Sequence, residues 1–318
     1  MFSYPKISII TPSYNQGQYI EQTILSVIGQ GYPNLEYIII DGGSTDNTVE
    51  IIKKYADKIT YWVSEPDKGQ SDALNKGLAK CTGDIFNWIN SDDYFEENSF
   101  FNIAQYFIDH PSIAMLSGFC NCFDNETFKQ IFLNRSEIFD CVEETLIQQK
   151  INQPASFYKL SIVKQMGGIN KDLHYCMDLD LWFRYLVQFG QTNILLVNDL
   201  FAHFRLHDES KTVQLQEKFR AEEKMLWQHL LNQLSVNKYL IAFFAGKEYI
   251  NSVQWKCLFI NKKKLVTIIC QRYFFEFYRQ KKYALTKFAF WNLLKVGRIK
   301  FAQPYLGIFY NLFVKRTS

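Results

Sequence analysis

Strand-like and helix-like segments alternate from Lys6 to Tyr94, and this alternation constrains the fold more than any other feature of the sequence. The apolar runs that predict β-strands are residues 7–10, 37–40, 59–63 and 85–89. The segments that predict helices between them are residues 20–28, 45–55 and 71–79. Because strands and helices joined by short links build parallel sheets with right-handed crossovers, we predict an α/β fold with a Rossmann-like, mostly parallel sheet flanked by helices.

Acidic residues follow three of the predicted strands. Asp41 comes directly after the second strand, Asp67 follows the third, and Asp92 and Asp93 follow the fourth. In open α/β sheets, the carboxyl ends of the strands meet at the ligand-binding crevice. Two adjacent carboxylates repel each other unless a cation lies between them, and Mg²⁺ or Mn²⁺ held by carboxylates and substrate phosphates is a common arrangement. The alternative is a solvated turn that caps a helix starting near Asn98.

The pattern is looser between Phe101 and Gln149. There the sequence predicts a helix to Asp109, a strand around residues 113–115 and a hairpin that extends to Arg135.

Asp178 lies in the first turn of a predicted amphipathic helix. The apolar positions of that helix are Leu181, Trp182, Tyr185, Leu186 and Phe189. Asp180 and Arg184 are four residues apart, so we expect them to pair and to serve structure. Asp178 has no such partner in the sequence. It can act as a helix N-cap or as a reactive carboxylate.

Charge is distributed very unevenly along the 318 residues. Residues 1–214 carry 16 Lys and Arg against 27 Asp and Glu, a net charge of −11, whereas residues 215–318 carry 19 against 5, a net charge of +14. The second segment is rich in aromatic residues, and we predict a mainly helical C-terminal region of residues 215–318 after a first domain of residues 1–214. Basic, aromatic helices bind anionic membrane surfaces, although a small helical domain with a solvated basic face is the alternative. No nucleic-acid motif accompanies the charge, so we do not expect nucleic acid as a partner.

The seven cysteines include no CxxC spacing, so neither a zinc site nor a disulfide framework is predicted. The first residues contain no apolar signal segment, and no run approaches 18 apolar residues without a charge. We therefore expect a cytoplasmic protein with reduced thiols, peripheral at the inner face of the cell membrane.

Four ordered motifs carry a family resemblance: residues 9–15 (IITPSYN), 41–46 (DGGSTD), 64–69 (SEPDKG) and 90–93 (NSDD). Further segments that belong to the pattern are residues 153–157 (QPASF), 167–168 (GG), 177–182 (MDLDLW) and 205–207 (RLH). In this order and spacing the chain resembles family 2 glycosyltransferases with the GT-A fold, of the bacterial type that builds cell-surface glycans. The resemblance covers roughly residues 6–212.

The resemblance implies an inverting transfer of a sugar from a nucleoside diphosphate-sugar donor to a hydroxyl of a glycan or lipid-linked acceptor, in a site that uses Mn²⁺ or Mg²⁺. The residues expected to bind the nucleotide-sugar are Thr11, Pro12, Tyr14, Asn15, Asp41, Asp67, Asn75, Lys76 and Asp92. The residues expected to bind the metal are Asp92, Asp93 and His207. Asp178 is expected to be the catalytic base. The loop at residues 11–17 can instead be an ordinary connection, and Asp41 an ordinary cap.

The sequence departs from the family pattern at several positions. Gly42 stands where the family commonly has a second acid that contacts the nucleobase, Asn90 replaces the first acid of the metal motif, and Leu74 replaces a common Arg. The identities of the nucleotide and the sugar are therefore left open.

Two other classes of function are weighed against the enzyme. One is a noncatalytic nucleotide-sugar-binding or scaffold protein with the same fold. The other is a nucleotidyltransferase, which would have a Gly/Arg-rich phosphate loop near the N-terminus, whereas residues 11–17 contain no Arg or Lys. The absence of a G-x-G-x-x-G fingerprint argues against a dehydrogenase.

Overall fold

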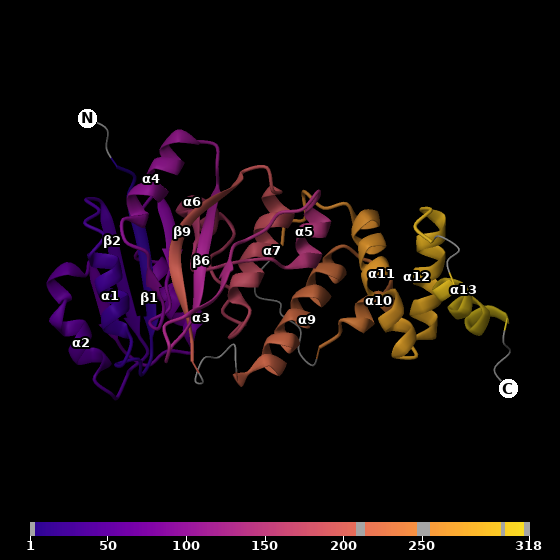
Figure 1. The fold of residues 1–318 in the computed structure, drawn as a ribbon, viewed down its shortest axis with the longest axis horizontal. Coiled ribbons are helices and arrows are strands. Elements are labelled where there is room, and N and C mark those ends of the chain that lie inside the picture. Colours follow the sequence, from indigo (N-terminus) through magenta and orange to yellow (C-terminus); the bar gives the residue numbers. More distant parts are fainter. Residues whose placement is uncertain (1–3, 208–213, 247–254, 300–302, 315–318) are drawn as a thin grey trace.

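The structure is a computed structural model that describes residues 4–207, 214–246, 255–299 and 303–314. A curled sheet lies at one end of the molecule, and the chain ends in helices at the other end (Figure 1). The strands are β1 (Ile7–Ser13), β2 (Leu35–Asp41), β3 (Tyr61–Ser64), β4 (Ile85–Trp88), β5 (Tyr94–Phe95), β6 (Met115–Asp124), β7 (Gln130–Asn134), β8 (Ser156–Lys159) and β9 (Ile194–Leu206). The helices of the first part are α1 (Ile20–Ile28), α2 (Thr48–Lys54), α3 (Gln70–Leu78), α4 (Ser99–Asp109), α5 (Val142–Gln148), α6 (Leu160–Gln165) and α7 (Met177–Phe189).

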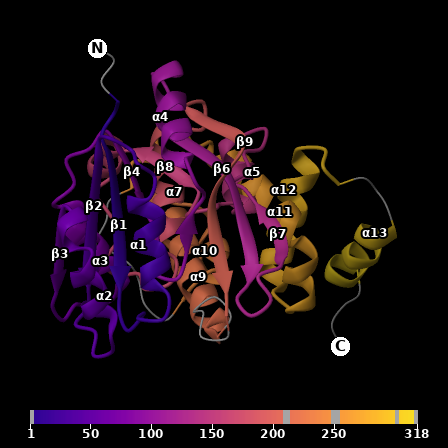
Figure 2. The same cartoon turned by 60° about the vertical axis from the view of Figure 1, so that its left-hand side comes forward.

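The first four strands form the predicted parallel sheet. Their order is β3-β2-β1-β4, and every neighbouring pair is parallel (Figure 2). The sheet continues as β8-β6-β9-β5, where β6 and β9 are parallel and β8 and β5 pair antiparallel with their neighbours. The carboxyl ends of β1, β2, β3 and β4 therefore lie at one edge, as the alternation predicts.

Two strands are longer than the sequence suggests. β1 continues through Pro12 to Ser13, because β2 pairs with it along this whole length. β4 pairs with β1 only as far as Ile10, so Pro12 sits where β1 has a neighbour on one side, and proline is tolerated at such places. The strand expected near residues 113–115 is the start of β6, which forms a hairpin with β7.

Alternate residues of the central strands face two different cores. Ile9 packs on the side of α1, α2 and α4, and Ile10 packs on the side of α3, α6 and α7. This two-sided burial explains why β2 is apolar over nearly its whole length, because a strand covered on both faces has no solvent-facing positions.

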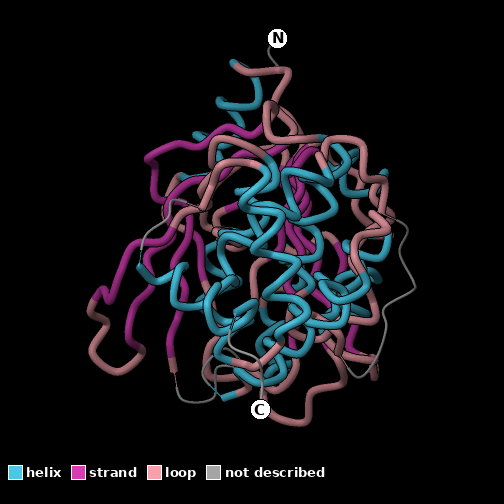
Figure 3. Tube along the Cα trace, turned by 90° about the vertical axis from the view of Figure 1, so that its right-hand side faces the viewer, coloured by secondary structure: helices cyan, strands magenta, loops and turns pink. Residues whose placement is uncertain are grey.

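The helices after residue 214 are α9 (Gln216–Gln233), α10 (Lys238–Phe243), α11 (Lys262–Arg279), α12 (Tyr283–Lys295) and α13 (Gln303–Phe309), followed by a π-helical turn (Tyr310–Val314). They lie over the helices that cover one face of the sheet (Figure 3). One hydrophobic core extends from Ile10 to Ile308, so it crosses the boundary predicted at residue 214. Among the described residues, no helix is both long enough and apolar enough to span a bilayer.

The aromatic residues of this C-terminal region divide between core and surface. Phe274, Phe277 and Phe290 are buried, whereas Phe275 and Trp291 are exposed. Most of the aromatic content therefore builds a packed helical unit. The exposed aromatic side chains remain available for contact with another surface.

Candidate active site

A pocket of about 670 Å³ opens at the carboxyl ends of β1 to β4. We call it the strand-end pocket. The residues that line it are Pro12, Ser13, Tyr14, Gln16, Gly42, Gly43, Pro66, Asp67, Gly69, Gln70, Ala73, Asn90, Ser91, Asp92, Phe204 and His207. No lysine or arginine occurs among these described residues. A diphosphate bound here would need a cation from outside the lining, because Asp67 and Asp92 add negative charge.

Asp92 and His207 lie side by side in the strand-end pocket. His207 Nε2 is 3.1 Å from Asp92 Oδ2, and the His207 ring packs on Tyr19 with 5.0 Å between ring centroids. The carboxylate keeps about a quarter of its surface exposed. A carboxylate and an imidazole that face the same cavity can hold a divalent cation if substrate oxygens complete its shell. The described residues contain no cluster of three His, Cys, Asp or Glu that could hold one without such help.

Asp93 points away from the pocket, contrary to its expected role as a metal ligand. Its Oδ1 accepts a hydrogen bond from the backbone N–H of Arg205 at 2.9 Å, and its Oδ2 accepts one from Asn90 Nδ2 at 3.2 Å. Burial, and then the charge of Asp92, raise the pKa of Asp93 well above its usual range. The structure therefore uses Asp93 to anchor the end of β9 beside the strand-end pocket.

The carboxylate of Asp67 lies next to the backbone of Gly42. A Cβ atom on Gly42 would lie 2.9 Å from Asp67 Oδ2, so a larger side chain at position 42 would collide with this carboxylate. Asp67 Oδ1 accepts a hydrogen bond from the N–H of Gly69, which holds the side chain in the pocket wall. Pro12 and the exposed Tyr14 also line the pocket, as the sequence predicts.

Thr11, Asn15 and Asp41 do not line the strand-end pocket. Thr11 is buried within β1, where its hydroxyl lies 3.1 Å from that of Tyr37. Asn15 Oδ1 accepts the N–H of Thr45 and so joins two loops.

The carboxylate of Asp41 is buried and occupied by local donors. It accepts hydrogen bonds from the N–H groups of Gly43 and Ser44 and from the hydroxyl of Ser64. Asp41 therefore stabilises the turn after β2 and the end of β3, and it caps no described helix, because Asn47 is the N-cap residue of α2.

Asn75 and Lys76 also point elsewhere. The side chain of Asn75 bonds the backbone of Ser71 and Ile169, which ties α3 to the loop before α7. Lys76 Nζ pairs with Glu65 at 2.8 Å outside the pocket. The sequence predicts that both residues contact a diphosphate. In the structure, both side chains instead bind protein groups.

A second pocket of about 360 Å³ adjoins the first, and we call it the Asp178 pocket. The residues that line both pockets are Gln70, Asn90 and Phe204. Asp178 is the second residue of α7 and is partly buried in this pocket. Its Oδ1 accepts the N–H of Leu179, and no described residue donates to its Oδ2. Burial, followed by the charges of Glu222 and Asp180, raises the pKa of Asp178, which makes the carboxylate a better proton acceptor.

Asp180 has the structural role that its spacing predicts. It is buried, and Arg184 Nη2 lies 2.6 Å from its Oδ2. The same guanidinium donates to the carbonyl groups of Met166 and Gly168 and so holds the Gly167-Gly168 turn against α7. Both members of the pair are therefore satisfied inside the core.

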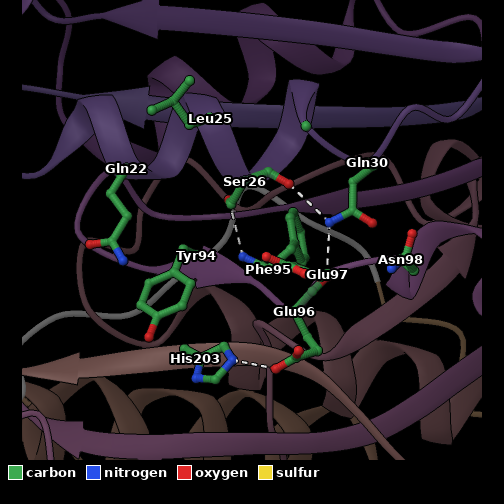
Figure 4. Close-up of a pocket in the computed structure, with 11 residues that line it drawn as sticks. Gln22, Leu25, Ser26, Gln30, Tyr94, Phe95, Glu96, Glu97, Asn98 and His203 are labelled. Carbon is green, nitrogen blue, oxygen red and sulfur yellow. Dashed lines mark hydrogen bonds and ion pairs between the residues drawn. The ribbon is translucent and has the colours of Figure 1, made fainter.

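A third pocket, of about 570 Å³, lies between α1, β5 and β9 (Figure 4). Its polar groups largely bind one another: His203 Nε2 lies 2.7 Å from Glu96 Oε2, and Gln30 Nε2 donates to the carbonyl of Glu96 at 2.8 Å. Ser26 Oγ accepts the N–H of Phe95. Because β5 follows Asp92 and Asp93 directly, these bonds fix the turn that carries Asp92.

Sequence reasoning missed Gln70 and Trp88 as lining residues. Gln70 Nε2 donates to Asn90 Oδ1 at 2.7 Å between the two pockets, and Trp88 faces the Asp178 pocket from β4. The position of Gln70 at the start of a helix after a strand-end loop is a signal that could have identified it. No pattern in the sequence identifies Trp88 as a lining residue, because it lies within an apolar run that predicts only a buried strand.

Residues 8–168 match the family described as "Glycosyl transferase family 2". An uncharacterized glycosyltransferase of Rickettsia typhi is 26% identical over 287 residues, which are 84% of this chain and 88% of that protein. Among solved structures, S. aureus TarS 1–349 in complex with UDP has a TM-score of 0.55 at 20% identity and covers 75% of this chain and 70% of its own. The mannosyltransferase PcManGT from Pyrobaculum calidifontis, solved with GDP-Man and Mn²⁺, has a TM-score of 0.52 at 18% identity and covers 74% of this chain and 66% of its own. These likenesses confirm the predicted GT-A fold.

Proposed function

Because this chain belongs to glycosyl transferase family 2, we propose that it transfers a sugar with inversion from a nucleoside diphosphate-sugar to a hydroxyl of a glycan or lipid-linked acceptor. The observation that carries the proposal is the pair of adjoining pockets. One contains Asp92 and His207 at the strand ends, and the other contains the carboxylate of Asp178. A donor in the strand-end pocket and an acceptor in the Asp178 pocket can therefore meet beside Gln70 and Asn90, which line both pockets.

The roles of the residues follow from their positions. Pro12, Tyr14 and Asp67 contact the nucleotide, and Asp67 offers an oxygen to an N–H of the base. Asp92 and His207 would hold Mn²⁺ or Mg²⁺, which neutralises charge on the departing diphosphate. Asp178 accepts the proton of the acceptor hydroxyl while that oxygen bonds the anomeric carbon and the bond to the diphosphate breaks.

A noncatalytic nucleotide-sugar-binding protein is the competing function. It would need the strand-end pocket but would have no use for a carboxylate of raised pKa in an adjoining cavity. Asp178 therefore favours the enzyme.

We expect UDP, dTDP or GDP to bind in the presence of Mn²⁺ and to bind much more weakly without it. The strand-end pocket has no described lysine or arginine, so only a cation can offset the diphosphate charge. Thermal stabilisation across this panel measures binding by mass action, with CDP and ADP as comparison nucleotides. Binding that is equally strong with EDTA would contradict the metal-dependent function.

We also propose that the C-terminal region attaches the enzyme to the inner face of an anionic membrane, beside a lipid-linked acceptor. Figure 1 shows α11 and α12 on the side of the molecule away from β1 and β2. These two helices carry exposed basic residues and the exposed aromatic residues Phe275, Tyr283 and Trp291. None of the described residues after 214 lines the strand-end pocket, so the described basic helices leave that pocket open.

We expect the whole chain to sediment with anionic vesicles at low salt and to be released at high salt, because the Debye length falls from about 10 Å at 0.1 M to about 3 Å at 1 M. Replacement of exposed Lys263, Lys281 and Lys282 by glutamine should weaken sedimentation. The matched control replaces exposed Lys53, Lys58 and Lys171 of the catalytic part. Equal loss in both triple variants would mean that net charge alone, and not this surface, is responsible.

A further inference from the structure

The loop that precedes α7 is held by a carboxylate from the C-terminal region. Glu222 of α9 accepts hydrogen bonds from three consecutive backbone N–H groups, those of His174, Tyr175 and Cys176, each at 2.8 Å. The glutamate is only 7% exposed. A buried carboxylate that receives three donors is a specific arrangement, because each of these bonds is assisted by its charge.

The donors lie where α7 begins. Cys176 is the N-cap residue of α7, and its side chain makes no capping bond. Glu222 thus places negative charge at the helix N-terminus, where the unpaired N–H groups and the helix dipole favour it. Asp178 follows two residues later, so any shift of this loop moves its carboxylate.

Other contacts join α9 to the same loop. The rings of Phe219 and Tyr175 pack with 5.4 Å between centroids, and Cys176 Sγ donates to the Phe219 carbonyl at 3.4 Å. Phe219 also lines the Asp178 pocket. The first turns of α9 therefore form part of the wall that surrounds the proposed acceptor.

We propose that Glu222 is a positioning residue for sugar transfer, which orients Asp178 by fixing the three N–H groups that precede α7. This inference rests on the proposed function, because it assigns Glu222 a part in the reaction through Asp178. Glu222 lines neither the strand-end pocket nor the Asp178 pocket, so its role is distinct from that of the proposed catalytic base.

Glu222 also contributes to the charge environment of Asp178. Among the described residues, the titratable groups that line the Asp178 pocket or interact with Asp178 are Asp180 on α7, Tyr158 on β8, Cys122 on β6, Glu222 on α9, and His174, Tyr175 and Cys176 before α7. After burial, the negative charges of Glu222 and then Asp180 favour the protonated form of Asp178. Removal of the Glu222 charge should therefore lower the pKa of Asp178.

The test is Glu222→Gln in the full chain. Transfer to water, followed as release of nucleoside diphosphate from the UDP-, dTDP- or GDP-sugar that binds best, needs no knowledge of the acceptor. We expect kcat to fall roughly tenfold to a hundredfold, since small displacements of a catalytic group have effects of this size. Donor affinity should be unchanged, and the acid limb of the kcat profile should move to lower pH.

Two further variants separate positioning from general stability. Glu222→Asp keeps the charge on a shorter side chain, so kcat should recover in part and the acid limb should stay at its original pH. Glu217→Gln changes an exposed glutamate on the same helix and should match the unmodified chain. Two results for Glu222→Gln would overturn the proposal. The first is an unchanged kcat. The second is a lower kcat together with a lower melting temperature and an acid limb at its original pH.

Titration of the Asp178 carboxyl by ¹³C NMR distinguishes failure of this inference from failure of the proposed function. If the unmodified chain releases no nucleotide from any donor, the proposed function fails. The NMR titration still decides the role of Glu222 in that case. An Asp178 pKa that is identical in the unmodified chain and in Glu222→Gln would refute the coupling.

Discussion

Asp178→Asn is expected to lower turnover by roughly two orders of magnitude or more, the usual scale of general acid–base catalysis, while donor and metal binding stay nearly unchanged. The amide cannot accept the proton of the acceptor hydroxyl. Asp178 lies in the pocket that adjoins the strand-end pocket, so its replacement leaves Asp92 and His207 in place. Single-turnover transfer and donor titration, measured on the same samples, separate the two effects.

The matched control is Asp172→Asn, which removes an exposed carboxylate from the loop before α7. Full turnover in Asp178→Asn on the true acceptor would show that another group accepts the proton.

The raised pKa of Asp178 also predicts the pH dependence. Because the base must be ionised, kcat should rise with pH through a value above the ordinary 3.8 of an aspartate. Folding favours the protonated form, so the contribution of Asp178 to stability is present at low pH and is lost as pH rises through its folded-state pKa. Asp178→Asn should therefore not lower the melting temperature at neutral pH. A marked destabilisation there would argue for a structural role.

The second large effect is expected for Asp92→Asn, which should abolish the metal dependence of donor binding and lower turnover by about a hundredfold to a thousandfold. Asp92 is the partly exposed carboxylate that shares the strand-end pocket with His207. In this variant, position 92 no longer supplies a carboxylate that can hold the cation against the diphosphate. Calorimetric titration of the nucleoside diphosphate with and without Mn²⁺ measures the change.

Asp93→Asn is the informative comparison. Asp93 Oδ2 accepts a hydrogen bond from Asn90 Nδ2, so an amide NH2 in its place would set two donors against each other in a buried position. The replacement should therefore lower the melting temperature and leave the metal dependence in place. The reverse pattern, in which Asp93→Asn loses metal dependence and Asp92→Asn keeps it, would restore the ligand role that the sequence suggested for Asp93.

The sequence predicts the first four strands and their parallel pairing, because each is a short apolar run and helix signals separate them. It does not predict that β4 pairs with β1 rather than with β3. It also places Asp67 and Asp92 at the strand-end pocket and pairs Asp180 with Arg184. It cannot tell which of two adjacent acids faces a cavity. Asp92 and Asp93 differ only in orientation, and that orientation is set by β9, more than 100 residues later in the chain.

Contacts made by other parts of the chain also explain why the roles of some residues were predicted wrongly or missed. Asp41 and Asn75 have the chemistry of ligands, but backbone groups that the turn and the loop bring near satisfy them first. Glu222 reads as one charge among several on an exposed helix. Its three donors belong to a loop 46 to 48 residues earlier, so no local pattern announces the contact.

The single core that runs from Ile10 to Ile308 has a consequence for how the protein is made. The parallel strands near the N-terminus have local partners and can begin to assemble on the ribosome. The loop before α7 cannot reach its final form until α9 has been synthesised and released, because Glu222 supplies the acceptor for its N–H groups. Completion of the Asp178 pocket is therefore a late event in biogenesis, and a chain whose translation stops early would lack the contacts that hold the loop before Asp178.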